Sequence, residues 1–477
     1  MKQPSIQSLD RRHFVKGVAA AAATAFGFQF IPSRAWGKLQ KPTLAAIGIG
    51  GKGAADLQGA MNAGFEIVGL VDVVDSRKIN DDKVERSSGK SREMHPQAPF
   101  FTDYREMLAS LGDRVDAVTV STPDHHHFHA ACLAMKSGKH VYCQKPLTHG
   151  LWEARTLARV ARETGVKTQM GNQAHALDHM RRCVELIQAG VIGGVREVHG
   201  WTNRPIWPQG IATPPEPEPV PAWMNWEQWL GPAPETGYSS KLAPFGWRGA
   251  WDYGCGALGD MACHILDLGW WATMPGDPVS VLAEQQGGTD WSPPISSKIT
   301  WEFAPSRHSS AAGCKFFWYD GYLNASFDRN SWSLAKKNEE YHHPDDAVMS
   351  GEGFRNYDTV IVGDYGRLYF SRERATWTLK AVHKLDGFKW PEPTIPRAVR
   401  QDNYQEWYDA ITGKVERGQS DFAVAGPFTE MILVGTLAQR IPGQKLEWDA
   451  GQLEVKGRPE TKGWIQRAYR KGWESPV

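Results

Sequence analysis

The segment 43–72 most constrains the fold, because it frames a glycine-rich turn between two apolar runs. TLAAI at 43–47 is typical of a buried parallel strand, and it leads directly into GIGGKG at 48–53. A helix is predicted at 54–63 and a second strand at 66–71, which is followed by Asp72. This order predicts the first strand–helix–strand unit of a Rossmann fold.

The glycines of this turn suit a bound dinucleotide. Gly48 allows the tight turn, Gly50 lets the backbone approach a pyrophosphate, and Gly53 permits close packing of the helix. The N-terminus of the helix adds amide donors and positive potential for the phosphates. We therefore predict that the cofactor is held by Gly48, Gly50, Gly51 and Gly53.

Asp72 lies where an acidic residue accepts hydrogen bonds from the adenosine ribose of the cofactor. A carboxylate there repels the 2′-phosphate of NADP, so NAD is the predicted cofactor. The nearby Arg77 leaves the alternative open, because a guanidinium group can accommodate that phosphate.

Strands and helices continue to alternate after this unit, which predicts a doubly wound parallel sheet. Helices are predicted at 104–110 and 129–137, and strands at 117–120, 140–143 and 168–170. Ligands bind at the carboxyl ends of such strands. The residues predicted to face the nicotinamide are therefore Ser121, Thr122, Pro123, His125, Gln144 and Lys145.

The pattern changes in the second half of the chain, which predicts a separate domain. The segment 315–319 belongs to long antiparallel strands, helices are predicted at 179–189, 403–411 and 426–439, and 211–221 is a proline-rich surface loop. The predicted organisation is a Rossmann domain at 41–168 and a substrate and oligomerisation domain at 169–477.

The first 36 residues resemble a twin-arginine export signal. Arg11 and Arg12 precede an apolar stretch at 17–31 that is too short for a permanent membrane span, and SRA at 33–35 offers a cleavage site. The prediction is a periplasmic or secreted protein with no stable membrane anchor after cleavage; an uncleaved anchor or a membrane-surface helix is the alternative.

Composition excludes several partners. The formal net charge is +1 and no long basic run occurs, so nucleic-acid binding is not expected. The six cysteines are scattered without metal-ligand spacing, so we predict no metal site. The 21 tryptophans are numerous, and we expect most of them to fill the core and others to provide flat surfaces for sugar rings.

Further motifs resemble the Gfo/Idh/MocA family of NAD(P)-dependent oxidoreductases, in its exported bacterial branch. They are STPDHHHFHA at 121–130, GKHVYCQKPLTH at 138–149, NRPIWPQG at 203–210, GALGDMACHILD at 256–267 and GQKLEWD at 443–449. The resemblance implies a C-terminal α/β domain with a large open sheet, homo-oligomers and carbohydrate or cyclitol substrates. The chain departs from the family's usual Glu-Lys-Pro at Gln144.

Oxidation of a secondary alcohol needs a base and a group that stabilises the alkoxide. By the resemblance, Lys145 supplies the cation and His264 accepts the proton. Asp260 and His264 are four residues apart, on one face of a helix. Asp260 then binds a substrate hydroxyl or orients the imidazole; a helix-capping aspartate beside a buried histidine is the alternative.

Other candidates come from loops near the predicted site. The resemblance places His125 and His127 in the nicotinamide pocket, whereas a metal site at the triple histidine is disfavoured because adjacent side chains point apart. Substrate contacts are predicted for Asn172, Gln173, Arg204 and Trp207. Each of these four can instead belong to ordinary loop structure.

Two reactions fit these residues. One is NAD-dependent oxidation of a secondary hydroxyl of a sugar or glycoside in the periplasm. The other is redox-neutral glycoside cleavage or epimerisation, in which NAD stays bound and is recycled. A non-catalytic sugar-binding protein is the third alternative, and the presence of Lys145, Asp260 and His264 argues against it.

Overall fold

Six parallel strands form the first sheet of the computed structural model, which describes residues 41–75, 87–381 and 389–477. Their order is β3-β2-β1-β4-β5-β6. The strands are β1 (Thr43–Ile47), β2 (Glu66–Val71), β3 (Phe100–Phe101), β4 (Ala117–Val120), β5 (His140–Cys143) and β6 (Thr168–Met170). The helices between them are α2 (Lys52–Ala63), α3 (Ser87–Met94), α4 (Tyr104–Leu111), α5 (His127–Lys136) and α6 (Leu151–Thr164). The predicted Rossmann fold is confirmed.

The register of this sheet brings the predicted cofactor residues to one edge. Ile47 pairs with Val71 on one side and with Val120 on the other, and Val120 pairs in turn with Cys143. All four residues end their strands. The residues that follow them therefore lie side by side at the carboxyl edge: Gly48, Asp72, Ser121 and Gln144.

The second sheet has nine strands in the order β15-β14-β13-β7-β10-β9-β8-β16-β17. The strands β7 and β10 pair in parallel, and the other neighbours pair antiparallel, as the sequence predicted. They are β7 (Val195–Thr202), β8 (Pro278–Gln286), β9 (Ser296–Phe303), β10 (Cys314–Asp320), β13 (Thr359–Gly363), β14 (Gly366–Ser371), β15 (Thr376–Ala381), β16 (Leu446–Asp449) and β17 (Glu454–Val455). A small hairpin pairs β11 (Ala325–Asp328) with β12 (Ser333–Lys336).

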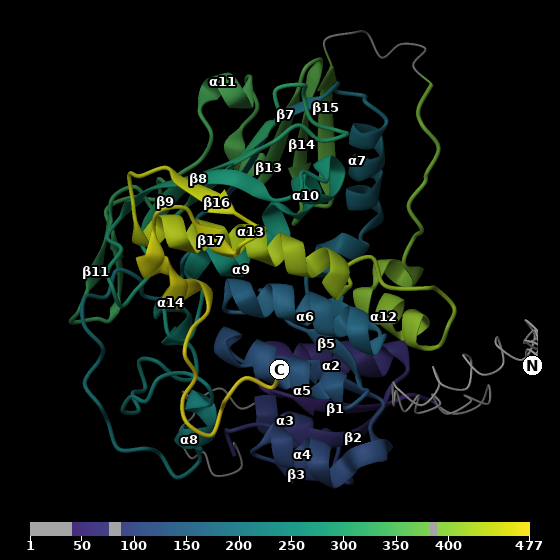
Figure 1. Cartoon of the computed structure of the whole chain (residues 1–477), viewed down its shortest axis with the longest axis vertical. Helices are drawn as coiled ribbons and strands as arrows, with labels where there is room; N and C mark the ends of the chain where they lie inside the picture. Colours follow the sequence, from purple (N-terminus) through teal and green to yellow (C-terminus); the bar gives the residue numbers. More distant parts are fainter. Residues whose placement is uncertain (1–40, 76–86, 382–388) are drawn as a thin grey trace, which may run out of the picture. The chain divides into compact units, whose positions relative to one another are not determined.

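The second half of the chain adds further helices (Figure 1). They are α7 (Asp178–Gln188), α8 (Trp226–Leu230), α9 (Gly256–Ile265), α10 (Asp267–Thr273), α11 (Asp346–Met349), α12 (Asn403–Ile411), α13 (Phe422–Arg440) and α14 (Lys462–Ile465). Some lie against this sheet and others, such as α8 and α12, beside the first half. In α13, Gly426 lies against Ala158 of α6 and Gly435 lies against Trp301 of β9. Alone among the described helices, α13 is long and apolar enough to cross a membrane, and 78% of that stretch is buried inside the protein.

Late parts of the chain return to the Rossmann sheet. Trp407 and Tyr408 of α12 pack on the ring of Phe65. Near the C-terminus, Arg467 forms an ion pair of 2.9 Å with Glu153 of α6. The nucleotide-binding half is therefore completed by residues far beyond its predicted boundary at 168.

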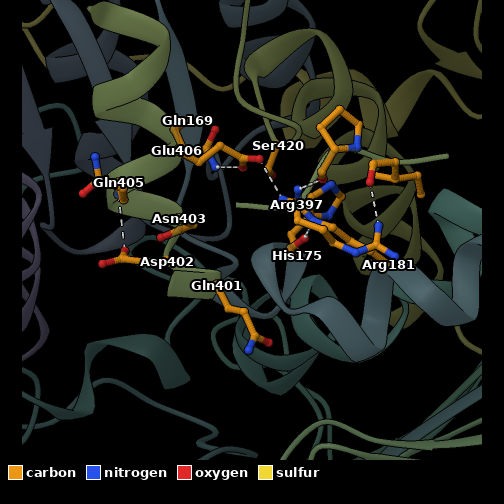
Figure 2. A network of polar contacts seen from close by, with 12 residues as sticks. Gln169, His175, Arg181, Arg397, Gln401, Asp402, Asn403, Gln405, Glu406 and Ser420 are labelled. Atoms are coloured by element: carbon orange, nitrogen blue, oxygen red, sulfur yellow. Dashed lines mark hydrogen bonds and ion pairs between the residues drawn. The ribbon is translucent and has the colours of Figure 1, made fainter. Parts of the chain in front are cut away.

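A buried polar network also ties α12 to the first sheet (Figure 2). Glu406 of α12 accepts hydrogen bonds from Arg181 at 2.7 Å and from Gln169 at 3.3 Å. Arg181 is fully buried, and its guanidinium group also donates to the backbone oxygen of His175. Burial of this ion pair makes the position of α12 depend on its partners in β6 and α7.

The tryptophans serve mainly as core, as predicted: 11 of the 20 that lie in the described residues are buried. Six tryptophans lie in the segment 203–255, of which only Trp223 and Trp247 are not buried; the segment contains little regular structure and packs around its own apolar cluster. Val73 and Val74, which follow the end of β2, pack against that cluster. The predicted export signal at 1–36 and Arg77 lie outside the described residues.

Candidate active site

A cavity of about 650 Å³ extends from the carboxyl edge of the parallel sheet to the helix α9. One end is lined by the glycine turn and Asp72, and the other by Lys145, Asp260 and His264. The predicted cofactor and catalytic residues therefore share one cavity, which also has the 203–255 segment as a wall.

The glycine turn has the close backbone approaches that were predicted. Gly48 has a φ of +79°, and a β-carbon on it would lie 2.6 Å from the carbonyl oxygen of Ser121. A β-carbon on Gly53 would lie 2.0 Å from the carbonyl oxygen of Gly48. Gly53 is the packing glycine and does not line the cavity, whereas Gly50 and Gly51 do. The turn leads directly into the N-terminus of α2, whose backbone amides and positive potential suit a phosphate ligand.

Asp72 is fixed at the cavity wall by two backbone amides. Its carboxylate accepts hydrogen bonds from the amides of Ile49 at 3.0 Å and Val74 at 2.9 Å. The side chain is thereby oriented beside the glycine turn, where a ribose diol would lie.

Two hydroxyl groups give an independent test of whether a nucleotide fits. Ser88 and Thr122 line the cavity, and their hydroxyl oxygens are buried without a hydrogen-bond partner in the described part of the chain. Buried polar groups are rarely left unpaired, so the cavity is built for a polar ligand. The residues present fit a dinucleotide held by the turn and by Asp72.

Asp56 explains why an amide is found at position 144. This fully buried carboxylate accepts hydrogen bonds from Gln144 Nε2 at 3.0 and 2.9 Å, from Ser121 at 2.6 Å and from Tyr404 at 2.6 Å, and forms an ion pair with Lys52 at 2.7 Å. A carboxylate at 144 would meet a second carboxylate, whereas an amide donates to it. Asp56 thus joins the ends of β4 and β5 to the first turn of α2.

Lys145 and Asp260 form the charged centre of the other end. Lys145 Nζ lies 2.6 Å from Asp260 Oδ1 and donates to the Asp260 backbone oxygen at 2.9 Å. Arg248 Nε lies 3.6 Å from the same carboxylate oxygen. Burial alone would raise the pKa of Asp260, but Lys145 and Arg248 together hold that pKa below its ordinary value.

His264 lies on the same face of α9, four residues after Asp260, as the spacing predicted. It lines the cavity, and its Nδ1 is buried without a hydrogen-bond partner among the described residues. Burial, followed by the positive charges of Lys145 and Arg372, lowers the pKa of His264 well below its ordinary value. The ring is therefore neutral at pH 7. In the described structure Asp260 bonds Lys145 and not the imidazole, so it positions the lysine.

The triple histidine contributes a different residue from those predicted. His126 lines the cavity, whereas His125 and His127 do not, which corrects the prediction for these two. His125 is held by the carbonyl of Trp229, and His127 by the carbonyls of Thr122 and Pro146. Both satisfy buried backbone oxygens and so fix the loop that follows β4.

Of the four residues predicted to contact substrate, the structure brings three to the cavity. Gln173, Arg204 and Trp207 line the cavity. Asn172 does not: it is buried, donates to Asp267 at 2.9 Å and accepts from Ser420 at 2.6 Å. Its role is structural, and the prediction that it contacts substrate is wrong.

Several cavity residues had no signal in the sequence. Arg248 and Arg372 lie in no recognised motif, and Lys52 is within the glycine motif without a fixed role there. The aromatic lining comes from a segment that the sequence presented as loop: Trp223, Trp229, Phe245 and Trp247. A clustering of tryptophans in 203–255 is the one clue the sequence carried.

Solved structures support the fold. A WlbA dehydrogenase from Bordetella pertussis, solved with NADH and UDP-GlcNAcA, aligns with a TM-score of 0.55 and 16% identity, over 86% of this chain and 99% of that one.

Two curated relatives match part of the chain. A glycosyl hydrolase family 109 protein from Akkermansia muciniphila is 30% identical over 190 residues, which are 39% of each protein. A 2,7-anhydro-N-acetylneuraminate hydratase from Escherichia coli is 31% identical over 94 residues, 19% of this chain and 25% of that protein. The chain thus spans well under half of the length of these relatives.

Family models match both halves of the chain. The model of an oxidoreductase family with an NAD-binding Rossmann fold matches residues 43–172. The model of that family's C-terminal α/β domain matches residues 180–291. With the parallel sheet, the glycine turn and the cavity described above, these matches show that the chain belongs to the Gfo/Idh/MocA oxidoreductase family and that its cofactor is NAD.

Proposed function

We propose that the protein oxidises a secondary hydroxyl group of a sugar or glycoside in the periplasm, with NAD as the oxidant. The observation that carries this proposal is the shared cavity, which places Lys145 and His264 at one end and the nucleotide-binding turn at the other. A substrate hydroxyl group bound in this cavity, between the nucleotide and α9, would contact both Lys145 and His264. The known sugar chemistry of relatives in the family supports the choice of substrate class.

The bound cofactor supplies the acceptor for the hydride that leaves the alcohol carbon. His264 is placed to take the hydroxyl proton, because its neutral imidazole lines the cavity and its Nδ1 has no hydrogen-bond partner among the described residues. Lys145 is suited to stabilise the negative oxygen that forms, since Asp260 holds its ammonium group in place at 2.6 Å. Asp260 therefore acts by positioning Lys145.

The lining of the cavity suits a sugar ring. Trp207 and Trp247 offer flat aromatic surfaces, and Gln173 offers an amide for hydroxyl groups. The guanidinium group of Arg248 lies 4.3 Å from the ring centre of Trp247 and orders that side of the wall. Apolar ring faces with a few polar groups are the usual design of a site for a small polar ligand.

We also propose that the protein is exported in its folded, NAD-bound form before it meets its substrate. The twin arginines and the short apolar stretch favour the route that carries folded proteins, so NAD can be bound before the protein leaves the cytoplasm. We also infer a homo-oligomer, because the family's large sheet often serves as its interface. Light scattering on the purified protein measures this state directly.

A second function is favoured by the curated relatives, whose names include a glycosyl hydrolase and a hydratase. In a redox-neutral reaction the same hydroxyl carbon is oxidised and later reduced again, so that water is added across the glycosidic bond without net use of NAD. Lys145 and His264 would serve both halves of such a cycle. Such a reaction suits a periplasmic protein, because the bound NAD is regenerated in each cycle and no supply of free NAD is needed outside the cytoplasm.

Purified protein incubated with a panel of sugars and aryl glycosides, with and without added NAD, separates these functions. Net oxidation gives NADH in proportion to the sugar consumed and needs added NAD for many turnovers. Redox-neutral cleavage releases the aryl group for many turnovers without NADH accumulation. Absence of both on every class of sugar, with NAD bound, contradicts the proposed function.

A further inference from the structure

The charges that line the cavity do not balance. Five cationic side chains line it, against the two carboxylates of Asp72 and Asp260, among the described residues. Three of the five form an ion pair of 3.0 Å or less with a buried carboxylate. The pairs are Lys52 with Asp56 at 2.7 Å, Lys145 with Asp260 at 2.6 Å and Arg248 with Asp124 at 3.0 Å.

Arg204 and Arg372 are the two that remain. Arg204 forms no ion pair with any described residue. The nearest acidic group to Arg372 in an ion pair is Glu373, at 3.6 Å, whose side chain is 81% exposed, so water screens that contact. Arg372 Nε is buried without a hydrogen-bond partner within the described chain. Asp358 accepts from the backbone amide of Arg372; burial raises the pKa of this carboxyl group to about 6, against the opposing effect of the Arg372 charge, so it is only a weak counter-charge for the guanidinium group.

The sheet topology brings these two arginines to the same edge. Arg204 follows β7 and Arg372 follows β14, and both strands pair antiparallel with β13. Thr359 of β13 is level with Gly200 of β7 on one side and with Phe370 of β14 on the other. The strands β7 and β14 therefore run in the same direction, about 10 Å apart, and both arginines leave them at the end that faces the cavity.

This edge is the substrate end of the cavity. Arg372 lies close enough to His264 for its charge to contribute to the lowered pKa of that histidine. The nucleotide phosphates have their own donors in the glycine turn and the first turn of α2. Arg372 is thus near the proposed reacting group, and Arg204 lines the same cavity from the same edge of the large sheet.

We propose that the substrate is an acidic sugar, whose anionic substituent is bound by Arg204 and Arg372. A neutral sugar would leave Arg204 without an acidic partner among the described residues and Arg372 Nε without a hydrogen bond, in a partly desolvated cavity, which is unfavourable. Guanidinium groups match the geometry of carboxylate, sulfate and phosphate oxygens. This inference rests on the proposed function for the site and adds the class of sugar.

The test compares acidic sugars with their neutral counterparts on the NAD-loaded protein. The probes are methyl glycosides of glucuronate and galacturonate, the matching 6-sulfates and 6-phosphates, and the neutral glucosides and galactosides. Binding is measured by calorimetry, and oxidation or cleavage is measured in parallel. At least one anionic form should bind roughly 10- to 100-fold more tightly than its neutral counterpart, and its identity assigns the oxyanion as carboxylate, sulfate or phosphate.

Variants show whether the two arginines cause that preference. Arg204→Gln and Arg372→Gln should each weaken binding of the anionic sugar roughly 10-fold or more, weaken the neutral counterpart much less, and leave NAD content unchanged. Arg374→Gln is the matched control, because Arg374 is exposed on the same loop and contacts Asn356. It should have no effect on either sugar.

The outcomes separate this inference from the proposed function. Equal binding and turnover of a neutral sugar and its acidic counterpart overturns the inference alone. Loss of NAD in the Arg204 or Arg372 variants also overturns it, because the arginines would then serve the cofactor. An acidic sugar that binds through both arginines without being oxidised or cleaved supports the inference and contradicts the proposed function.

Discussion

Gln144→Glu tests the contact between Gln144 and Asp56. The amide nitrogen lies 3.0 and 2.9 Å from the two oxygens of a fully buried carboxylate. Two unit charges about 3 Å apart repel by about 5.5 kcal/mol at an effective dielectric constant of about 20. Protonating the introduced carboxyl group instead costs less than this repulsion, about 3.7 kcal/mol at pH 7 for a glutamate pKa of about 4.3. This protonation cost is therefore the upper limit on the loss of stability.

The predicted loss of unfolding free energy is therefore about 2–4 kcal/mol at pH 7, falling to about 1 kcal/mol at pH 5. The sign follows from the raised pKa of the introduced group: the folded state keeps the proton, and the unfolded state releases it above a pH of about 4.3. Urea unfolding at several pH values, as the difference from the unaltered protein, measures this dependence. NAD affinity should fall as well, because Asp56 holds Ser121 and α2.

Two control variants separate charge from packing. Gln144→Met removes the hydrogen bond without adding charge, so its cost of about 1–3 kcal/mol should not vary with pH. Asp56→Asn combined with Gln144→Glu restores a single carboxylate and should be more stable at pH 7 than Gln144→Glu alone. Unaltered stability in Gln144→Glu at pH 7, or no recovery in the double variant, would refute the reasoning.

Three other predictions follow from the structure and the sequence. Burial lowers the pKa of His126 and His149 to about 3 and of His129 and His140 to about 4, so below pH 6.5 these histidines take up protons in the unfolded state before they do so in the folded state. Each histidine should therefore lower the free energy of unfolding by up to about 1.4 kcal/mol per pH unit, and a urea midpoint that does not fall from pH 6.5 to 4.5 contradicts this. Asp72→Ser should weaken NAD binding and reduce the ratio of NAD affinity to NADP affinity, since serine cannot accept hydrogen bonds from both Ile49 and Val74. Equal affinity of the unaltered protein for both nucleotides would contradict the role assigned to Asp72. Replacing Arg11 and Arg12 by lysines should block export, and cell fractionation that finds the variant delivered normally removes the twin-arginine claim.

The parallel sheet was predictable because its signals are local. The strand at 43–47, the glycine turn and the strand at 66–71 are adjacent in the sequence, and each residue's task follows from its place in that unit. The spacing of Asp260 and His264 was equally local, since both lie on α9.

Contacts between distant segments decided the remaining residues. Asn172 lies beside a predicted site residue, Gln173, yet Asp267 and Ser420 draw it into the core from 95 and 248 positions away. His125 and His126 occupy a tight 3₁₀ turn, where the direction of each ring depends on carbonyls more than 100 residues later. No local pattern contains that information.

The cationic lining has the same origin. Arg372 reaches the cavity because β14 and β7 end at one edge of the large sheet, which depends on strand order. Pairing with Asp124 likewise brings Arg248 from the short 3₁₀ helix Gly246–Gly249 to the site. The sequence contains these arginines, but their positions at the cavity depend on strand order and ion pairing, which no local sequence pattern reveals.

The most direct test of the central claim compares turnover and NAD content in Lys145→Ala, His264→Ala and the double variant. Each single change should lower turnover by about 10²- to 10⁴-fold on a sugar that the unaltered protein accepts. Because both side chains act on one hydroxyl group, the double variant should lose far less than the product of the two single effects, with NAD bound normally in all three. Near-normal turnover in either single variant with NAD bound would contradict the account and place the catalytic residues elsewhere.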